Sequence, residues 1–395
     1  MALTLSARAA RISKAEIRNM TVECERVGGI NLAQGVCDME VPPAVIRGAE
    51  AAMHHGTNAY TRHDGLAVLR RAIAKKMERF NGIRVDPEAE VVVSAGSTGA
   101  FYCACIALLD PGDEVVLFEP YYGYHLNTLL AVDAVPRFVR MHPPGWTYDP
   151  AVLEAAIGPR TKAIIVNTPG NPSGKVFSDE ELQHIAGLAV RHDLFVFTDE
   201  IYEYFVYDGL RHRSPGAIDA ISDRTITISG YSKTFSITGW RIGYCVCRAR
   251  WAEMIGYVND LVYVCAPAPL QAGVAAGIES LGDEYYEALR QSFCRKREVM
   301  CAALEEAGFG LARPRGAYYV LADARHLPGS NSKDKALHML RTTGVAAVPG
   351  ESFFFDGGGE NFLRFCYAKT DGELAEACER LRRHGRGQPS WHPSI

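Results

Sequence analysis

Between residues 91 and 246 the sequence alternates short, almost entirely apolar runs with longer segments of helical pattern. A strand without a polar face needs cover on both sides, and a mainly parallel sheet between two layers of helices provides that cover. The sequence therefore predicts an α/β fold with a mainly parallel sheet covered by helices. The predicted strands lie at 91–93, 114–118, 135–140, 163–166, 194–198, 225–229 and 242–246.

The segments outside this region predict a second, smaller α+β domain. A long helix is expected over 283–307, followed by strand-like runs at 318–322 and 362–367 and a final helix over 371–383. Another helix is expected near the N-terminus, over 13–27. The predicted division is an N-terminal arm with part of the small domain (1–45), a large domain (46–285), a small C-terminal domain (286–385) and a tail (386–395).

Two local patterns predict individual helices within the large domain. Apolar residues at 66, 69, 73 and 77 predict an amphipathic helix over 65–80. Ser178, followed three residues later by Glu181, is the capping-box pattern that begins a helix.

Charge and composition exclude several classes of function. The net charge is −4 and no stripe of Lys and Arg appears, so the chain lacks the electrostatic signature of a nucleic-acid-binding protein. No apolar run reaches the roughly 18 residues that a membrane span needs, and the N-terminus lacks the apolar core of a signal peptide. A cytoplasmic location is therefore expected. The eleven cysteines lack zinc-ligand spacing, so we expect buried thiols in a reducing compartment and no metal.

Polar and charged residues follow the predicted strands, where ligands bind in an open parallel sheet. Together they offer a helix N-terminus, an aromatic face, an amide, a carboxylate, a phenol, an amine and a guanidinium. One planar, phosphorylated cofactor with a cationic nitrogen would use all of these groups, and pyridoxal 5′-phosphate (PLP) fits that description. The residues are Ser97 and Thr98 in the turn 96–99, Tyr122, Asn171, Asp199, Tyr202, Lys233 and Arg241.

Each group has an expected role toward PLP. Lys233 is expected to form a Schiff base with the cofactor aldehyde, and Asp199 to keep the pyridine nitrogen protonated. Asn171 and Tyr202 are expected to hydrogen-bond the phenolic oxygen of the ring, and Tyr122 to lie on its face. The phosphate is expected to meet the helix start and a guanidinium, through Ser97, Thr98 and Arg241.

Taken singly, each residue also has an ordinary structural explanation, such as a helix cap for Asp199 or a turn residue for Asn171. A dinucleotide-binding fold is the nearest competing interpretation, because the turn 96–99 follows a strand and Glu119 ends the next one. That turn lacks a G-x-G start, and a dinucleotide fold leaves Lys233 unexplained. The joint placement of the candidate site residues at strand ends therefore favours the PLP site.

Three motifs carry a resemblance to a known family: 232–243 (SKTFSITGWRIG), 171–174 (NPSG) and 199–202 (DEIY). Over roughly residues 5–385 the chain resembles the class I/II aminotransferases of the fold-type I PLP-dependent superfamily. Residues 167–169, 234–236 and 364–369 look most like the kynurenine/glutamine/aromatic branch.

The resemblance implies further site residues. Arg364 is expected to bind the substrate α-carboxylate, together with Asn171 and the backbone amide of Gly35. Tyr60 is expected to reach the phosphate of the neighbouring subunit's cofactor, so a homodimer is the expected functional unit.

The sequence departs from the family pattern at two places. Gly230 stands where many members have a serine that touches the phosphate, and Ser232 or Ser229 is the expected substitute. In the loop 35–41, which borders the substrate in the family, Cys37 stands in place of the usual proline.

The function implied is a ping-pong aminotransferase, which moves an amino group between an L-amino acid and a 2-oxo acid with Lys233 as the general base. Aromatic, apolar or sulfur-containing side chains are favoured, with Arg62 as an alternative contact for a distal carboxylate. The competing function is a PLP-dependent lyase or synthase that uses a quinonoid for β-elimination, γ-substitution or C–C bond formation. The residues expected around the substrate side chain are Tyr60, Tyr122, Tyr124 and 353–355.

Overall fold

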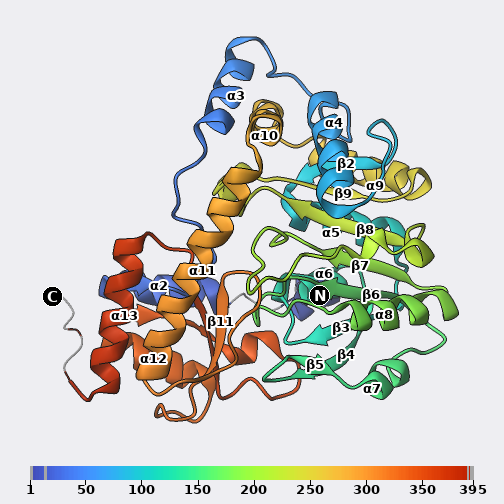
Figure 1. Ribbon diagram of the computed structural model, residues 1–395. Helices are drawn as coiled ribbons and strands as arrows, with labels where there is room; N and C mark the ends of the chain where they lie inside the picture. The colour runs from blue at the N-terminus through green and yellow to red at the C-terminus, as the bar shows by residue number, and fades with distance from the viewer. Residues whose placement is uncertain (1–2, 13–15, 389–390, 392–395) are drawn as a thin grey trace.

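An eight-stranded sheet is the centre of the larger part of the molecule (Figure 1). The computed structural model describes residues 3–12, 16–388 and 391. Along the sheet, the strands are β2 (Val91–Ala95), β9 (Ile242–Val246), β8 (Thr225–Gly230), β7 (Phe195–Asp199), β6 (Thr161–Asn167), β3 (Glu114–Glu119), β4 (Val135–His142) and β5 (Thr147–Tyr148). All seven predicted strands are present, and the prediction of a mainly parallel sheet is confirmed.

Strand β9 runs antiparallel to both of its neighbours, β8 and β2. The sequence pattern placed Ile242–Val246 among the parallel strands, which is wrong. The connection from β8 to β9 spans only residues 231–241 and holds a single short 3₁₀ turn. A parallel return needs a longer crossover, usually a helix, so this short connection forces the chain to turn back antiparallel.

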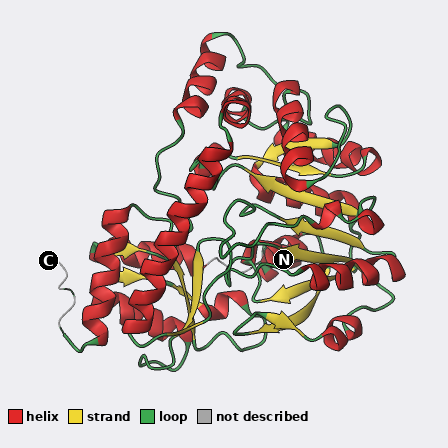
Figure 2. Ribbon diagram, viewed as in Figure 1, coloured by secondary structure: helices red, strands yellow, loops and turns green. Residues whose placement is uncertain are grey.

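Helices cover the large sheet on both faces (Figure 2). The Ser178 capping box forms as predicted, with the Ser178 hydroxyl accepting from Glu181 N and the Glu181 carboxylate accepting from Ser178 N. The helix predicted over 65–80 runs from Ala67 to Lys76 and continues as a π-helical turn, Met77–Asn81. The helices of this part are α3 (Pro43–His54), α4 (Ala67–Lys76), α5 (Gly96–Leu108), α6 (Gly123–Ala131), α7 (Pro150–Ala155), α8 (Asp179–Arg191), α9 (Ala249–Tyr263) and α10 (Ala268–Ser280).

A second, four-stranded antiparallel sheet lies beside three long helices at the left of Figure 1. Its strands are β10 (Gly310–Leu311), β11 (Tyr319–Asp323), β14 (Phe362–Cys366) and β13 (Val348–Pro349), and the helices are α11 (Asp283–Glu306), α12 (Ser332–Thr343) and α13 (Asp371–Gly385). Helix α12 was not predicted. The division of the chain at residues 46 and 286 stays a prediction.

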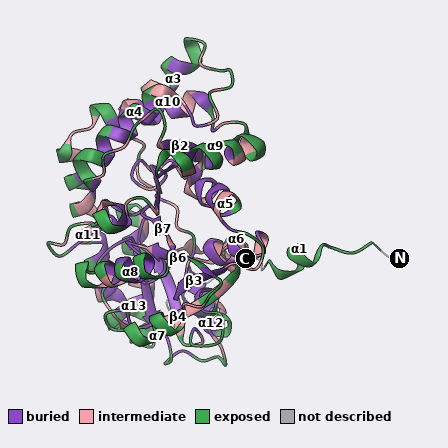
Figure 3. Cartoon of the chain, turned by 90° about the vertical axis from the view of Figure 1, so that its right-hand side faces the viewer, coloured by how far each residue is buried: buried purple, intermediate pink, exposed green. Residues whose placement is uncertain are grey.

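The N-terminal segment is tied to both parts of the molecule. Helix α1 (Ala7–Arg11) extends outward in Figure 3, and Arg8 and Arg11 pair with Asp133 at the end of α6. Helix α2 (Glu16–Val27) forms most of the predicted helix, whose residues 13–15 lie outside the described part. It leads into β1 (Ile30–Asn31), which pairs in parallel with β12 (Val345–Ala346).

Six strands of the large sheet, β2, β3, β6, β7, β8 and β9, are almost entirely buried, and the edge strands β4 and β5 are partly exposed (Figure 3). All eleven cysteines are free thiols and nine of them are buried, so the prediction of buried thiols holds for most of them. Within the described part of the chain, no helix is long and apolar enough to cross a membrane.

Candidate active site

A cavity of about 510 Å³ opens where the carboxyl ends of β6, β7 and β8 meet the small sheet. The large sheet contributes polar residues that follow its strands, because the carboxyl ends of parallel strands meet at one edge. Residues 17–36 and the small-sheet residues Tyr319 and Arg364 complete the cavity, so it joins segments more than 300 positions apart. Eleven of the twelve predicted site residues line it. They are Gly35, Ser97, Thr98, Tyr122, Asn171, Asp199, Tyr202, Ser232, Lys233, Arg241 and Arg364.

Tyr60 is the predicted site residue that does not line this cavity. It lies on the loop before α4 and its side chain is 84% exposed. Arg62 does not line the cavity either, because its guanidinium pairs with Asp64 and Glu88. The expected contact of Arg62 with a distal carboxylate therefore has no support within this subunit.

The N-terminus of α5 and the Arg241 guanidinium form the anion-binding end of the cavity. Arg241 donates to the carbonyl oxygens of Thr238 (3.0 Å) and Ala95 (3.4 Å), which holds it over the helix start. Gly96 permits this approach: it has a φ of +78°, and a Cβ there would lie 2.1 Å from Arg241 Nη2. A helix N-terminus beside an arginine is suited to a phosphate group.

Of the two serines expected to replace the missing phosphate contact at Gly230, Ser232 lines the cavity. Ser229 turns away, since its hydroxyl donates to the Glu203 carboxylate (2.9 Å) on the other side of the strand. Side chains alternate along a strand, and this alternation sends Ser229 into the core.

Asp199 has a buried partner that the sequence motifs did not indicate. His125 Nε2 lies 2.9 Å from Asp199 Oδ2, and the two side chains are 3% and 11% exposed. His125 belongs to α6, three residues after the N-cap residue Tyr122, and the two rings meet edge-on with centroids 5.4 Å apart. This spacing was the signal available in the sequence.

Buried charges behind Asp199 hold the segment that carries it. Glu200 accepts hydrogen bonds from Ser214 (2.8 Å) and is 2.6 Å from His212 Nε2, while the ammonium group of Lys76 lies 2.5 Å from Glu203. Glu200, Glu203 and His212 have the composition of a metal site. The Lys76 ammonium already supplies a cation to this cluster, so we interpret the cluster as structural.

Lys233 projects from the end of β8 into the cavity and is half-buried. Its Nζ donates to the carbonyl oxygen of Gly35 (2.9 Å), and the Cys37 thiol donates to the carbonyl oxygen of Lys233 (3.6 Å). Burial lowers the pKa of the Lys233 amine below its ordinary value. The loop 35–41 therefore contacts the lysine directly.

Arg364 is 1% exposed and is held from several sides. Its Nη1 donates to Asn171 Oδ1 (2.8 Å) and its Nη2 to the carbonyl oxygen of Ala33 (2.5 Å). The guanidinium also packs on the Tyr319 ring, 4.3 Å from the centroid. Its Nε is buried without a hydrogen-bond partner among the described residues, so this arginine retains a donor for a ligand.

Tyrosines form the wall between Arg364 and Asp199. The hydroxyls of Tyr202 and Tyr319 lie 2.9 Å apart, and the ring of Tyr122 stacks on that of Tyr124 with centroids 5.2 Å apart. A Cβ at Gly35 would lie 2.0 Å from the Tyr319 hydroxyl, so any larger residue there would displace the Tyr319 side chain. Tyr319 was not among the predicted site residues.

The donor set fits PLP together with an amino acid. Ser97, Thr98 and Arg241 offer an anion site, Asp199 a carboxylate for a cationic ring nitrogen, and Lys233 an amine for an aldehyde. Arg364, with its unpartnered Nε, lines the same cavity and offers a site for a carboxylate.

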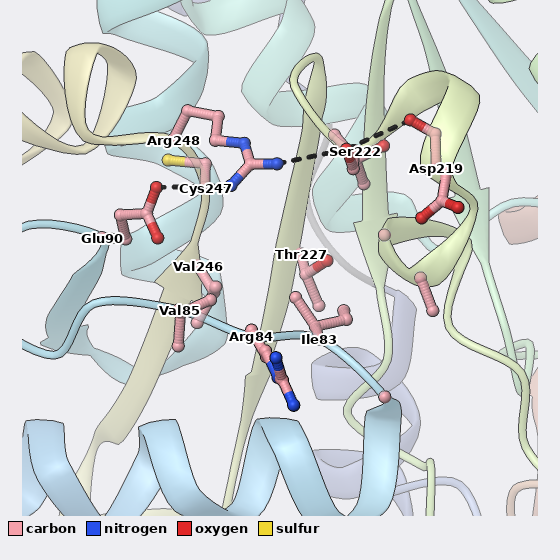
Figure 4. A pocket seen from close by; sticks show the side chains of 14 residues that line it. Ile83, Arg84, Val85, Glu90, Asp219, Ser222, Thr227, Val246, Cys247 and Arg248 are labelled. Carbon is pink, nitrogen blue, oxygen red and sulfur yellow. Dashed lines mark hydrogen bonds and ion pairs between the residues drawn. The ribbon is translucent and has the colours of Figure 1, made fainter.

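A separate cavity of about 320 Å³ lies on the far side of β8 and β9 (Figure 4). Arg248 crosses one side of it, with Nη1 3.7 Å from Glu90 and Nη2 3.3 Å from the Ser222 hydroxyl. None of the predicted site residues lines it. We therefore place the active site in the 510 Å³ cavity.

A mainly parallel sheet that gathers a lysine, an aspartate and an anion-binding helix start at one edge defines the fold-type I class of PLP-dependent enzymes. The chain belongs to the aminotransferases of class I and II, whose family model matches residues 27–381. The predicted resemblance to class I/II aminotransferases is thereby confirmed, and the protein is an aminotransferase; the assignment to the kynurenine/glutamine/aromatic branch stays a prediction.

Individual relatives match over nearly the whole chain. A probable N-succinyldiaminopimelate aminotransferase of Mycobacterium tuberculosis is 36% identical over 92% of this chain and 94% of its own. A methionine aminotransferase of Escherichia coli is 31% identical over 92% of this chain and 94% of its own. The solved structure of the Mycobacterium tuberculosis N-succinyldiaminopimelate aminotransferase superposes with a TM-score of 0.92 at 36% identity, covering 96% of this chain and 99% of that one.

Proposed function

We propose that this aminotransferase holds PLP in the cavity at Lys233 and exchanges an amino group between an L-amino acid and a 2-oxo acid by a ping-pong mechanism. The observation that carries the proposal is the presence of Lys233, Asp199, Arg241 and Arg364 around one cavity. Bound there, PLP would supply an aldehyde for the amino group and an electron-accepting ring.

The protein side chains have distinct roles in this scheme. Lys233 is the covalent anchor, and its freed Nζ takes the proton from the substrate α-carbon. The Arg364 guanidinium and the Gly35 amide orient the α-carboxylate. Asp199 pairs with the ring nitrogen, Asn171 and Tyr202 with the ring oxygen, and Tyr122 covers the ring. The helix start at Ser97 and Thr98 holds the phosphate together with Ser232 and Arg241.

For the amino donor we favour an aromatic, apolar or sulfur-containing side chain. The part of the cavity wall that is not assigned to PLP includes the aromatic and aliphatic residues Tyr124, Tyr319, Ile17, Val36 and Ile201, beside the polar or charged residues Arg18, Gln34, Asn167 and Thr238. Phe353, which was expected beside the substrate, packs 5.2 Å under Arg364 and supports that arginine. The relatives are named for substrates as different as N-succinyldiaminopimelate and methionine, so their names do not select one class.

We further propose that the working unit is a homodimer. Tyr60 is 84% exposed on this subunit and does not contact its cavity. Exposure of a large aromatic residue is compatible with a contact to a second copy, where Tyr60 would reach the phosphate.

The half-reaction tests the proposed function. The enzyme loaded with PLP is mixed with single amino acids, without an oxo acid, and the visible absorbance of the cofactor is recorded. We expect loss of that band with one equivalent of 2-oxo acid formed per site, fastest for aromatic, apolar or sulfur-containing donors. Release of ammonia with the band retained would contradict transamination. A Lys233→Ala variant should show neither the band nor turnover.

A further inference from the structure

The loop 35–41 is fixed at the base of the cavity by contacts at both of its sides. Asp38 pairs with Lys369 (2.6 Å), and its amide donates to the carbonyl oxygen of Ala368 (3.3 Å), just after β14. Burial raises the pKa of Cys37 to about 12, so its thiol remains protonated and donates to the Lys233 backbone. The Gly35 carbonyl is thereby held beside the Lys233 amine.

A second donor contacts the same carbonyl group. The Tyr318 hydroxyl donates to Gly35 O at 3.2 Å, and Lys233 Nζ donates to it at 2.9 Å. Tyr318 is fully buried, and its ring packs edge-on against Tyr202 with centroids 5.0 Å apart. Burial raises the pKa of the Tyr318 hydroxyl, so this group stays a donor over the range in which enzymes work.

The hydroxyl groups of Tyr318 and its neighbour Tyr319 bond to different partners in the site. Tyr319 points its hydroxyl to Tyr202, on the side of the ring oxygen, and Tyr318 points its hydroxyl to Gly35, on the side of the lysine. The two rings lie together, with centroids 4.8 Å apart, and only their hydroxyls have different partners.

We propose that Tyr318 is a positioning residue for Lys233: its hydroxyl fixes the Gly35 carbonyl, and this carbonyl holds the lysine amine whenever the amine is not joined to the cofactor. The inference rests on the proposed role of Lys233 as the base. A neutral amine that donates one N–H to Gly35 keeps its lone pair available for a proton.

The proton transfer shows why this position matters. The C–H bond at the substrate α-carbon breaks, an N–H bond forms at Nζ, and the electron pair stays with the substrate. A lysine side chain has four flexible bonds, so an unheld amine would spend most of its time outside reaction distance. The Gly35 carbonyl restricts the amine and also accepts from the ammonium ion that forms.

Tyr318→Phe tests the proposal, because it removes the hydroxyl and keeps the ring. Tyr367→Phe is the matched control, since Tyr367 is equally buried and its hydroxyl donates to the carbonyl oxygen of Ala317 (3.1 Å), which is not a residue of the proposed site. A crystal structure of cofactor-free Tyr318→Phe should show Lys233 Nζ displaced from Gly35 O. The absorbance band of the loaded enzyme should match that of the wild type, because the lysine is covalently held in that state.

In single-turnover half-reactions, Tyr318→Phe should be slower by about 10-fold, with a larger isotope effect from α-deuterated substrate, and Tyr367→Phe should not. An unchanged rate and isotope effect, or an equal loss in both variants, would overturn the role of Tyr318. A retained Nζ–Gly35 contact would overturn it as well. If Tyr318→Phe unfolds, Tyr318→Met gives the same test without a ring. Turnover by Lys233→Ala is the separate result that would remove the proposed function itself.

Discussion

His125 Nε2 lies 2.9 Å from Asp199 Oδ2 in a buried part of the active-site wall, and the Tyr122 ring meets the His125 ring edge-on at 5.4 Å between centroids. One imidazole therefore contacts both the carboxylate proposed to pair with the cofactor nitrogen and the ring proposed to cover the cofactor. We therefore interpret His125 as a positioning residue that orients Asp199 and Tyr122.

We predict that His125→Ala weakens PLP binding and slows the half-reaction by about 10-fold. The variant removes the partner of Asp199 Oδ2, while Oδ1 still accepts from the Ile201 amide (3.3 Å). Leaving a buried polar atom unpaired costs roughly 1–3 kcal/mol. The dissociation constant of PLP, measured from its visible absorbance, checks this expectation. His142→Ala is the control on an exposed histidine; equal behaviour of the two variants would contradict a role for His125.

Replacement of Arg364 by lysine should weaken amino-acid binding and leave PLP binding unchanged. Lysine keeps the charge and loses the planar fork that holds Asn171, Ala33 and a substrate carboxylate together. The expected loss is about 2–5 kcal/mol in substrate binding for Arg364→Ala and less for Arg364→Lys. Substrate titrations of the half-reaction measure it, and an unchanged affinity in both variants would exclude Arg364 as the carboxylate site.

The half-reaction rate should rise with pH and level off below the pH at which an exposed lysine titrates. Burial lowers the pKa of the Lys233 amine, so its neutral form is available at a lower pH than the ordinary value of 10.5 allows. In the cofactor-free protein, the unfolded chain binds the extra proton, so this group should make the free energy of unfolding increase with pH between the two pKa values. A single-turnover pH profile and urea unfolding at several pH values check the two effects.

Gly96→Ala should lower the affinity for PLP more than it lowers stability. A Cβ at this position would lie 2.1 Å from Arg241 Nη2 and would push the guanidinium from the helix start. Gly112→Ala is a matched control, because Gly112 also has a positive φ, +90°, and no atom lies within 4 Å of its added Cβ. Both variants should lose about 1–3 kcal/mol of stability from backbone strain, and only Gly96→Ala should lose PLP affinity. Equal PLP affinities would contradict the anion site at this helix.

A mixture of two inactive or weakened variants should regain activity if Tyr60 serves the neighbouring subunit. A dimer with one Lys233→Ala chain and one Tyr60→Ala chain contains a single site with both residues intact. We expect co-refolded chains to bind PLP and turn over faster than either variant alone. Mixing without any recovery, although the chains exchange, would show that Tyr60 acts within its own subunit or not at all.

Much of the fold was readable because hydrophobic periodicity is a local property. The apolar runs at the seven predicted strands and the capping box at Ser178 each depend on a few consecutive residues, and their positions in the structure agree with the prediction to within a few residues. The two-residue strand β5 (Thr147–Tyr148) was not predicted. The direction of β9 was missed, since strand direction depends on the length of a connection and on the neighbouring strands. Helix α12 was also missed.

In the site, too, local motifs were predicted and contacts between distant segments were missed. Motifs of consecutive residues predicted Lys233, Asp199, Asn171 and Arg241, and these line one cavity. His125, Tyr318 and Tyr319 were missed because their contacts join segments that are remote in sequence. Tyr318 lies 283 positions from Gly35, and no local pattern records that pairing.

By itself, the sequence determined the class of fold, the family and the chemical groups of the site, because these depend on residue types at fixed spacings. Only the tertiary structure decided which of these groups are hydrogen-bonded to one another. It turned Ser229 into the core, placed the Gly35 carbonyl on the Lys233 amine and set His125 against Asp199. Hydrogen bonds act over about 3 Å, so their partners are known only when the packed chain brings distant segments together.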